Sequence, residues 1–264
     1  MISEWEARGA GEITLSAKCV ETGKTVTWNP TLKSPSASVI KLPILIHAAL
    51  LARKGRLDWE QKLTFHETDK TPGSGVLTHL SEGLTLSTKD VCTLMICMSD
   101  NSATNMMIDI LGVEPINERI RDLGCSDTEL FRKVFGTNPY KDPEDAKYGL
   151  GVTTVADQLH LLELIQGNKI GDTETCDIIR AMLGKQFYRE GIPRLLGPDI
   201  TFMGKSGSVD HVRNDVGIVV TPQGRTIIMA IFCQEIVEVL WTSNNVGLLA
   251  IANLSKAIVE YLNV

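Results

Sequence analysis

Alternating apolar and polar positions mark both ends of the chain and predict β-strands there. Near the N-terminus, residues 13–20 alternate in this way, and a turn at Thr22-Gly23-Lys24 leads into a second short run. Near the C-terminus, three further runs are separated by short breaks at residues 209–213 and 221–224. We therefore expect five antiparallel strands, which cover residues 13–20, 25–28, 200–208, 215–220 and 225–233.

The middle of the chain is predicted to be mostly helical, because apolar residues recur there at spacings of three and four. The predicted helices cover residues 38–53, 88–98, 103–111, 115–123, 155–165 and 172–183. A last helix over residues 246–262 carries an apolar stripe that includes Leu248, Ile251 and Ile258, as a helix covering a sheet would. Residues 131–154 lack periodicity and hold several glycines and prolines, so we expect a long loop there.

These elements predict an α/β protein of the α+β type. A five-stranded antiparallel sheet built from both chain ends is expected to be flanked by helices, with an all-α lobe inserted between the two ends. We assign residues 1–54 and 191–264 to the α/β lobe and residues 55–190 to the all-α lobe. A cleft between lobes is the usual place for a site, so we expect the active site there.

Composition and charge narrow the classes of partner. The chain has 264 residues, of which 32 are acidic and 26 basic, with a net charge of −6 and no dense Lys/Arg block, so nucleic acid is not an expected partner. The longest apolar stretch, residues 39–52, contains Lys41, Pro43 and His47 and is shorter than the ~20 residues that span a bilayer. We therefore expect no membrane partner. The sequence does not indicate an oligomeric state.

The first residues of the chain bear on its location. Residues 1–12 carry acidic side chains where a secretion signal has a basic segment, and no apolar core of a signal follows. The sequence as it stands therefore predicts a cytoplasmic protein, or a secreted or periplasmic one if a leader has been removed.

Cysteines and histidines give no support for a metal site or a cofactor. The six cysteines are scattered and form no CxxC pair, so we interpret all of them as structural thiols. The five histidines never occur at a ligand spacing such as HExxH, and the chain has no GxSxG turn. We therefore predict no metal and no cofactor.

The first of three chemically suggestive motifs opens the first long helix. In Ser38-Val39-Ile40-Lys41, the spacing of three places the serine hydroxyl and the lysine amine on one helix face. A desolvated lysine close to another cation can be neutral enough to take the serine proton. Backbone N–H groups at a helix N-terminus can stabilise a developing oxyanion.

The other two motifs are Ser99-Asp100-Asn101, directly after a helix, and Lys205-Ser206-Gly207-Ser208, inside a late strand. The strand motif offers a cation, hydroxyl groups and backbone N–H groups where Gly207 permits close approach. Each motif alone also has an ordinary explanation, as a helix cap in the first two cases and an edge-strand lysine in the third. Their combination and order carry more information than any one of them.

Ser-x-x-Lys, Ser-Asp-Asn and Lys-Ser-Gly in this order form the signature set of penicillin-recognising serine enzymes. The chain resembles the class A β-lactamase family and its D,D-peptidase relatives. The similarity extends to residues 73–77, to residues 102–105 and to Asn214-Asp215, and it covers nearly everything from Ile13 to Leu262. It implies the two-lobed fold of that family and a serine hydrolase that forms an acyl-enzyme with a small-molecule acyl substrate, a β-lactam or a peptide-like compound.

The resemblance also implies roles for individual residues. Ser38 is expected to be the nucleophile and Lys41 to activate it, while Ser99 passes a proton to the leaving nitrogen. Asn101 is expected to hold Lys41 and the substrate amide.

The third motif and the strand after it are expected to bind the substrate. The resemblance implies that Lys205, Ser206 and Arg213 contact the substrate carboxylate. It further implies that the backbone N–H groups of Ser38 and Ser208, beside Gly207, form the oxyanion hole.

One feature of the class A pattern is missing. The family carries Glu-x-x-Leu-Asn on its long loop, and that Glu aims the deacylating water. If Asn138 aligns with the family Asn, Val134 stands at the position of the Glu, and a valine cannot act as a base. The alternative base is another acid of the same loop, Asp142, Glu144 or Asp145.

The missing Glu leaves the function open between several classes. We expect acylation of Ser38 by β-lactams and slow hydrolysis of the β-lactam amide. The alternatives are a D,D-peptidase-like enzyme, an amidase or esterase acting on another acyl donor, and a β-lactam-binding or muropeptide-sensing module that acylates without turnover.

Overall fold

A five-stranded antiparallel sheet forms the centre of the computed structural model, which describes residues 1–137 and 140–263. The strand order is β2-β1-β10-β9-β8. The strands are β1 (Glu12–Cys19), β2 (Thr25–Trp28), β8 (Thr201–Val209), β9 (Val212–Val220) and β10 (Thr226–Gln234). The predicted fold class is therefore confirmed, with the two early strands and the three late strands in one sheet.

Strand β9 begins three residues earlier than its pattern predicts. Val209 pairs with Val212, so only Asp210 and His211 form the turn between β8 and β9. His211 has a φ of 60°, in the left-handed region that tight hairpin turns often use. As a result, Arg213 and Asn214 lie within the strand, opposite Ser208 and Gly207 of the third motif.

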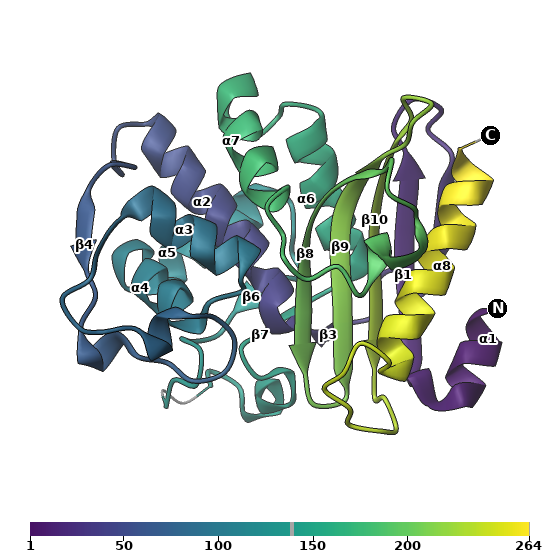
Figure 1. Cartoon of the computed structure of the whole chain (residues 1–264), viewed down its shortest axis with the longest axis horizontal. Helices are drawn as coiled ribbons and strands as arrows, with labels where there is room; N and C mark the ends of the chain where they lie inside the picture. Colours follow the sequence, from purple (N-terminus) through teal and green to yellow (C-terminus); the bar gives the residue numbers. More distant parts are fainter. Residues whose placement is uncertain (138–139, 264) are drawn as a thin grey trace.

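Both faces of the sheet are covered, which explains why the central strands are almost wholly apolar. Successive residues of β10 enter two different cores, with Ile228 and Phe232 in one and Ile227 and Met229 in the other. Helix α8 (Val246–Leu262) packs on the second of these faces, with α1 (Ile2–Trp5) beside it (Figure 1). α1 and the π-helical turn Glu6–Ala10 that follows it were not predicted.

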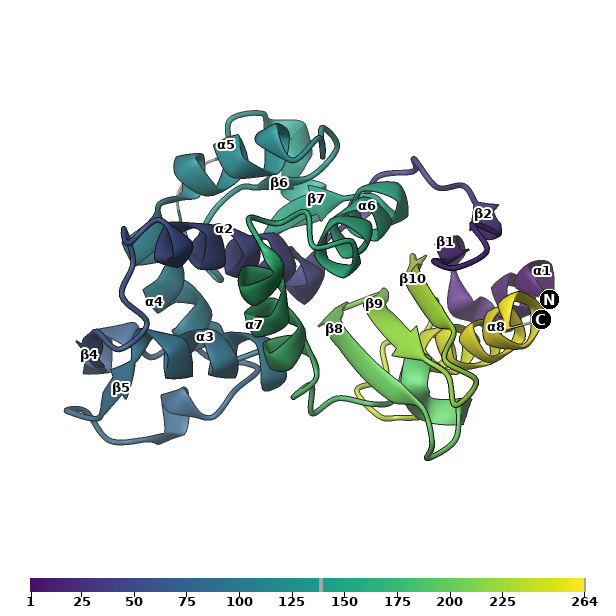
Figure 2. The same ribbon diagram turned by 90° about the horizontal axis from the view of Figure 1, so that it is seen from above.

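The remaining helices lie on the other side of the sheet (Figure 2). They are α2 (Lys41–Arg53), α3 (Thr88–Cys97), α4 (Asn101–Leu111), α5 (Val113–Asp122), α6 (Val155–Gln166) and α7 (Thr173–Leu183). α2 packs against α3, α4, α5 and α7, although the sequence division assigned its residues to the sheet lobe. Conversely, α6 contacts β1, β9 and β10, so one continuous core joins the inner face of the sheet to the helices.

Two minor sheets lie outside the predicted elements. One pairs β4 (Lys62–Thr64) with β5 (Thr85–Ser87), and the other has the order β3-β7-β6. β3 (Ser34–Pro35), β7 (Gly151–Thr153) and β6 (Glu129–Leu130) are too short to show alternation in the sequence. This second sheet ties both ends of the long loop to the residues that precede Ser38. Within the described ranges, no helix combines the length and the apolar character needed to cross a membrane.

We predict that His47, buried in α2, makes stability depend on pH. Burial lowers its pKa from 6.5 to about 4, and the positive charges of Arg119, Arg56 and Lys54 act in the same direction. The unfolded chain therefore binds a proton below pH 6.5 that the folded protein does not bind. Relative to a His47→Leu variant, the wild-type free energy of unfolding should fall by about 1.4 kcal/mol for each unit by which the pH decreases from 6.5 to about 4. Urea unfolding of both proteins at several pH values tests this, and a pH-independent difference would contradict it.

Candidate active site

Ser38 lies in a 3₁₀ turn, Ala37–Ile40, that leads directly into α2. The prediction that Ser38 opens the long helix is therefore corrected, because regular α-helix begins only at Lys41. With three residues per turn, 3₁₀ geometry places side chains at a spacing of three on one side, as Ser38 and Lys41 require. Ala37 has a φ of 43°, an unfavourable conformation for a residue with a Cβ. Backbone strain of this kind is common beside functional residues.

Strand β8 approaches the backbone of Ser38 at the glycine of the third motif. A Cβ on Gly207 would lie 2.9 Å from the Ser38 nitrogen and 3.0 Å from the Val39 nitrogen, closer than real Cβ contacts. Only glycine therefore allows this approach. Opposite Gly207 on β9, Asn214 donates its side-chain amide to the Pro35 carbonyl at 2.8 Å. The resemblance pointed to Asn214 without giving it this role of fixing the segment before the serine.

Lys41 is fully buried, and its Nζ is surrounded by acceptors from the second motif. It donates to the Ser99 carbonyl at 2.7 Å, to Ser99 Oγ at 3.1 Å and to Asn101 Oδ1 at 3.1 Å. Burial lowers the pKa of Lys41 well below its usual 10.5, and the nearby charge of Lys205 lowers it further, while Asp100 acts in the opposite direction. The structure thus joins the first two motifs around an amine that loses its proton more readily than an ordinary lysine does.

Asp100 holds the second motif in place and is not among the groups that accept a hydrogen bond from Lys41 Nζ. One carboxylate oxygen caps α4 by accepting from the Ala103 N–H at 2.9 Å, and the other accepts from Val76 and Leu77 at 2.6 and 2.9 Å. Gly75 lies so close that a Cβ there would be 2.3 Å from Asp100. The loop that contains the Gly-Ser-Gly sequence therefore wraps around Asp100 and sets the position of its neighbours.

Lys205 is fully buried in β8 and donates to the Ser206 carbonyl at 2.6 Å. Burial lowers its pKa to about 7, although the nearby Asp215 acts in the opposite direction. Asp215 pairs with Ser206 across the two strands, and burial raises the pKa of its carboxyl group. Its Oδ2 accepts from the Ile192 N–H at 2.8 Å. The third motif thus brings a second cation and a buried carboxyl group toward Ser38.

Arg213 lies in the expected place but is already engaged. Its guanidinium donates to the carbonyls of Val209, Val212 and Leu240, each at 2.7 Å. It also lies over the Trp241 ring, 4.6 Å from the ring centroid. Three of its five N–H groups are thus used within the protein. Its charge is close to the site, but its capacity to bind a substrate carboxylate directly is reduced.

Two cavities reach Ser38. The first, here called the polar cavity, measures about 280 Å³ and is lined by Ser38, Ser99, Glu190, Ser206, Ser208, Arg213 and Asp215, among others. The second, here called the large cavity, measures about 790 Å³ and is lined by Ser38, Asn101, Val134, Phe135, Tyr148, Leu150 and Trp241, among others. The nucleophile therefore lies between a small polar space and a larger, more apolar one.

Val134 lines the large cavity and is held there by α4. Its N–H donates to Asn105 Oδ1 at 2.8 Å, and its carbonyl accepts from Asn105 Nδ2 at 3.1 Å. Next to it, Lys133 pairs with Asp109 of the same helix at 2.6 Å. The loop thus presents an apolar side chain at this position. Asn138, on which the alignment with the family Asn depends, lies outside the described residues.

The acids proposed as substitutes lie elsewhere. Glu144 and Asp145 line a separate cavity together with Lys33. Asp142 caps the 3₁₀ helix Pro143–Tyr148, and its Oδ1 accepts from the Glu144 N–H at 2.9 Å. In this arrangement neither cavity that Ser38 lines receives a carboxylate from these positions.

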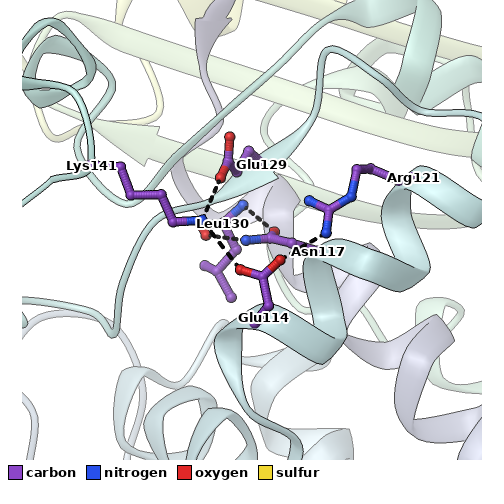
Figure 3. Close-up of polar contacts among 6 residues, drawn as sticks. All are labelled: Glu114, Asn117, Arg121, Glu129, Leu130 and Lys141. Atoms are coloured by element: carbon purple, nitrogen blue, oxygen red, sulfur yellow. Dashed lines mark hydrogen bonds and ion pairs between the residues drawn. The ribbon is translucent and has the colours of Figure 1, made fainter.

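Ion pairs hold the long loop in place at Lys141 (Figure 3). Lys141 Nζ lies 3.2 Å from Glu114 of α5 and 3.6 Å from Glu129 of β6, while Arg121 contacts Glu114 at 2.8 Å. Asn117 adds two hydrogen bonds of 2.8 Å to the backbone of Leu130. These contacts hold Lys141 against α5 and β6, away from the two cavities that Ser38 lines. In the part of the chain that the structure describes, no group of three His, Cys, Asp or Glu side chains is arranged to hold a metal.

Comparison with known proteins gives consistent results. A sequence model described as the Beta-lactamase enzyme family matches residues 1–262. The β-lactamase BRO-1 of Moraxella catarrhalis is 22% identical over 205 residues, which are 76% of this chain and 64% of that protein, so the chain spans less than two thirds of this relative. The β-lactamase VEB-1 of Pseudomonas aeruginosa is 23% identical over 220 residues, 80% of this chain and 73% of that protein.

Solved structures agree with these sequence matches. The crystal structure of a β-lactamase from Sphaerobacter thermophilus superposes with a TM-score of 0.88 at 30% identity, over 99% of this chain and 95% of that chain. A Leu-to-Glu variant of PBP-A, solved as an acyl-enzyme with penicillin G, superposes with a TM-score of 0.85 at 23% identity, over 99% and 94% of the two chains, and shows the fold alone. Because the family match runs along nearly the whole chain, the resemblance carried by the three motifs is confirmed: this chain belongs to the β-lactamase enzyme family.

Proposed function

We propose that this protein is a serine hydrolase that β-lactams acylate at Ser38, that hydrolyses the β-lactam amide, and that releases the acyl group slowly. The observation that carries the proposal is the buried Nζ of Lys41, which lies one turn from Ser38 and is hydrogen-bonded to Ser99 and Asn101. The membership of the chain in the β-lactamase enzyme family supports an acyl-enzyme mechanism.

In the first step, Lys41 in its neutral form takes the proton of Ser38, whose Oγ attacks the carbonyl carbon. A new C–O bond forms, and the C–N bond of the substrate then breaks. Because Ser99 Oγ lies 3.1 Å from Lys41 Nζ, the proton can pass from Lys41 through Ser99 to the leaving nitrogen. In its charged form, Lys205 disfavours a second positive charge on Lys41.

The oxyanion that forms during attack is expected to lie between the N–H groups of Ser38 and Ser208. The approach of Gly207 to within van der Waals distance of the Ser38 backbone supports this geometry. Fixed backbone donors of this kind need no rearrangement as charge develops, which is the basis of oxyanion stabilisation.

We infer slow release from Val134, which lines the large cavity. At Val134, the side chain is apolar and its backbone is held by Asn105. The three loop acids that were considered as substitutes lie away from both cavities.

The same observation favours a second candidate function, a β-lactam-binding or muropeptide-sensing module that is acylated once. It shares the acylation chemistry and differs only in the fate of the acyl-enzyme. A D,D-peptidase-like enzyme or another amidase or esterase is equally compatible with the nucleophile. The lifetime of the acyl-enzyme separates the sensor from these enzymes.

We predict that benzylpenicillin forms a covalent adduct on Ser38 that persists for hours. Intact-mass spectrometry over time after mixing measures both the formation of the adduct and its loss. Ser38→Ala should remain unlabelled, because it lacks the attacking oxygen. The absence of an adduct on the wild-type protein would refute the proposed function, and labelling of the Ser38→Ala variant would refute the choice of nucleophile.

We predict that Lys41→Ala slows acylation by benzylpenicillin by about 10²- to 10⁴-fold, the usual contribution of a general base. Only neutral Lys41 can accept the serine proton. The wild-type rate should therefore fall as the pH decreases through the Lys41 pKa, and it should already be level well below pH 10.5 because burial and Lys205 lower that pKa. Stopped-flow acylation rates across this pH range test the assignment. A pH profile that the substitution leaves unchanged would remove Lys41 from the base role.

We predict that Val134→Glu accelerates loss of the acyl group by about a hundredfold, because it adds a carboxylate to the cavity that Ser38 lines. Val134→Gln is the matched control, since it has nearly the same size and hydrogen-bonding capacity but no basic group. Deacylation is followed as the decay of the benzylpenicillin adduct by mass spectrometry. Equal decay in the two variants would show that a base at this position is not what the wild-type protein lacks.

A further inference from the structure

The large cavity lies on the acyl side of Ser38, an assignment that rests on the proposed function. Ser206 and Arg213, which are expected near the substrate carboxylate, line the polar cavity together with Ser38. In a penicillin, this carboxylate is attached to the ring that keeps the leaving nitrogen. The acylamino side chain, on the other side of the scissile carbonyl, therefore extends into the large cavity, which Ser38 also lines.

Positive charge predominates where the long loop forms the wall of the large cavity. Arg132, Lys133 and Lys147 of this loop line the cavity. Among the described residues that line it, the only acid is Asp210, which belongs to the turn between β8 and β9. Its Oδ1 accepts a hydrogen bond from Trp241 Nε1 at 3.2 Å. The loop wall thus carries three cations and no carboxylate within residues 1–137 and 140–263.

The two lysines of this wall are poor candidates for a specific contact. Lys133 Nζ lies 2.6 Å from Asp109 of α4, so its charge is already neutralised. Lys147 is exposed, and its Nζ lies over the Tyr148 ring, 5.1 Å from the ring centroid. An exposed ammonium on a flexible side chain is screened by solvent and contributes little to binding.

Arg132 offers unused hydrogen-bond donors in a fixed orientation. It is half-buried, and its guanidinium lies over the Tyr140 ring, 4.3 Å from the ring centroid. Stacking occupies the face of a guanidinium and leaves the N–H groups along its edge available. The neighbouring Lys133 and Val134 make hydrogen bonds to α4, whereas Arg132 donates none within the described ranges. Such a guanidinium can bind a carboxylate through two parallel hydrogen bonds.

The rest of the large cavity suits a hydrocarbon chain. Its volume is about 790 Å³, and its lining includes Val134, Phe135 and Leu150. Apolar walls with a few well-placed polar groups are typical of sites for small organic molecules, in which the polar groups fix the orientation. The cavity therefore combines an apolar surface for methylene groups with one arginine for an anionic end.

We propose that the large cavity selects acyl groups that end in a carboxylate, and that Arg132 is the specificity-determining residue. The methylene groups of such a side chain pack on the apolar wall, and its terminal carboxylate accepts hydrogen bonds from Arg132. During acylation, Ser38 Oγ forms a bond to the carbonyl carbon and the C–N bond of the β-lactam breaks. The Ser38 proton passes to that nitrogen along the path proposed above, and the terminal carboxylate stays unchanged in the acyl-enzyme.

Two penicillins with side chains of nearly the same size test this preference. In one, the acyl side chain is a glutaryl group, which ends in a carboxylate. In the other it is the glutaramoyl group, which ends in a neutral primary amide. The β-lactam, the scissile amide and the ring carboxylate are identical, so contacts in the polar cavity cancel. The ratio of the two acylation rate constants thus reports the effect of the terminal group.

We expect the glutaryl penicillin to acylate Ser38 about tenfold faster than the glutaramoyl penicillin, which corresponds to ~1.4 kcal/mol. Arg132→Gln should bring this ratio close to one. Arg225→Gln is the matched control, because it removes the same charge from the turn between β9 and β10, at the end of β9 opposite to Arg213. It should leave the ratio unchanged. Stopped-flow acylation rates with mass-spectrometric identification of the Ser38 adduct measure each ratio.

A ratio near one in the wild-type protein, or a ratio that Arg132→Gln leaves unchanged, would overturn the inference and leave the proposed function intact. The same conclusion would follow if benzylpenicillin labelled Ser38 and the glutaryl penicillin did not. An equal loss of rate with benzylpenicillin and with both test compounds in Arg132→Gln would indicate a structural role and overturn the assignment to Arg132. Failure of benzylpenicillin to label the wild-type protein would refute the proposed function, and this inference with it.

Discussion

The burial of Lys41 is the constraint on which the rest of the site depends. An ammonium group without solvent is strongly unfavourable unless acceptors surround it. Ser99 and Asn101 supply three such contacts, and they can do so only because Asp100 caps α4 and binds the loop that passes over it. Lys205, also fully buried, adds a repulsive charge. Desolvation and repulsion together lower the pKa of Lys41 and so favour its neutral form, the form that can accept a proton.

Close backbone approach is the second requirement, and it explains several otherwise unfavourable features. Ala37 and Ser99 both have positive φ values, of 43° and 52°, although neither is a glycine. Gly207 lets β8 reach the Ser38 backbone, and Asn214 fixes the chain just before Ala37. Strained residues persist where surrounding contacts determine their positions, and here these contacts come from the central sheet and from α4.

The loop that carries Val134 is anchored to the helical side of the molecule at several points. Asn105 holds Val134 by two backbone hydrogen bonds, and ion pairs to Lys133 and Lys141 fix the chain on either side. The loop position is thus maintained independently of the side chain at residue 134. The proposed acylation and deacylation steps consequently use different parts of the molecule, the first the buried lysines and the second the side chain that the loop presents to the large cavity.

Local pattern was sufficient to predict much of this protein. The period of two located the strands, the period of three to four located the long helices, and three motifs indicated a serine acyl-transfer site and its family. Only tertiary structure decided where α2 and α6 pack, that β3, β6 and β7 form a sheet, and that Arg213 is engaged by three carbonyls. It also decided that Glu190 and Asp215 line one cavity together with Ser38. The reason is that periodicity reflects the burial of each residue along its own element, whereas a free N–H group, an unpartnered carboxyl oxygen or a lowered pKa depends on atoms from segments far apart in the chain.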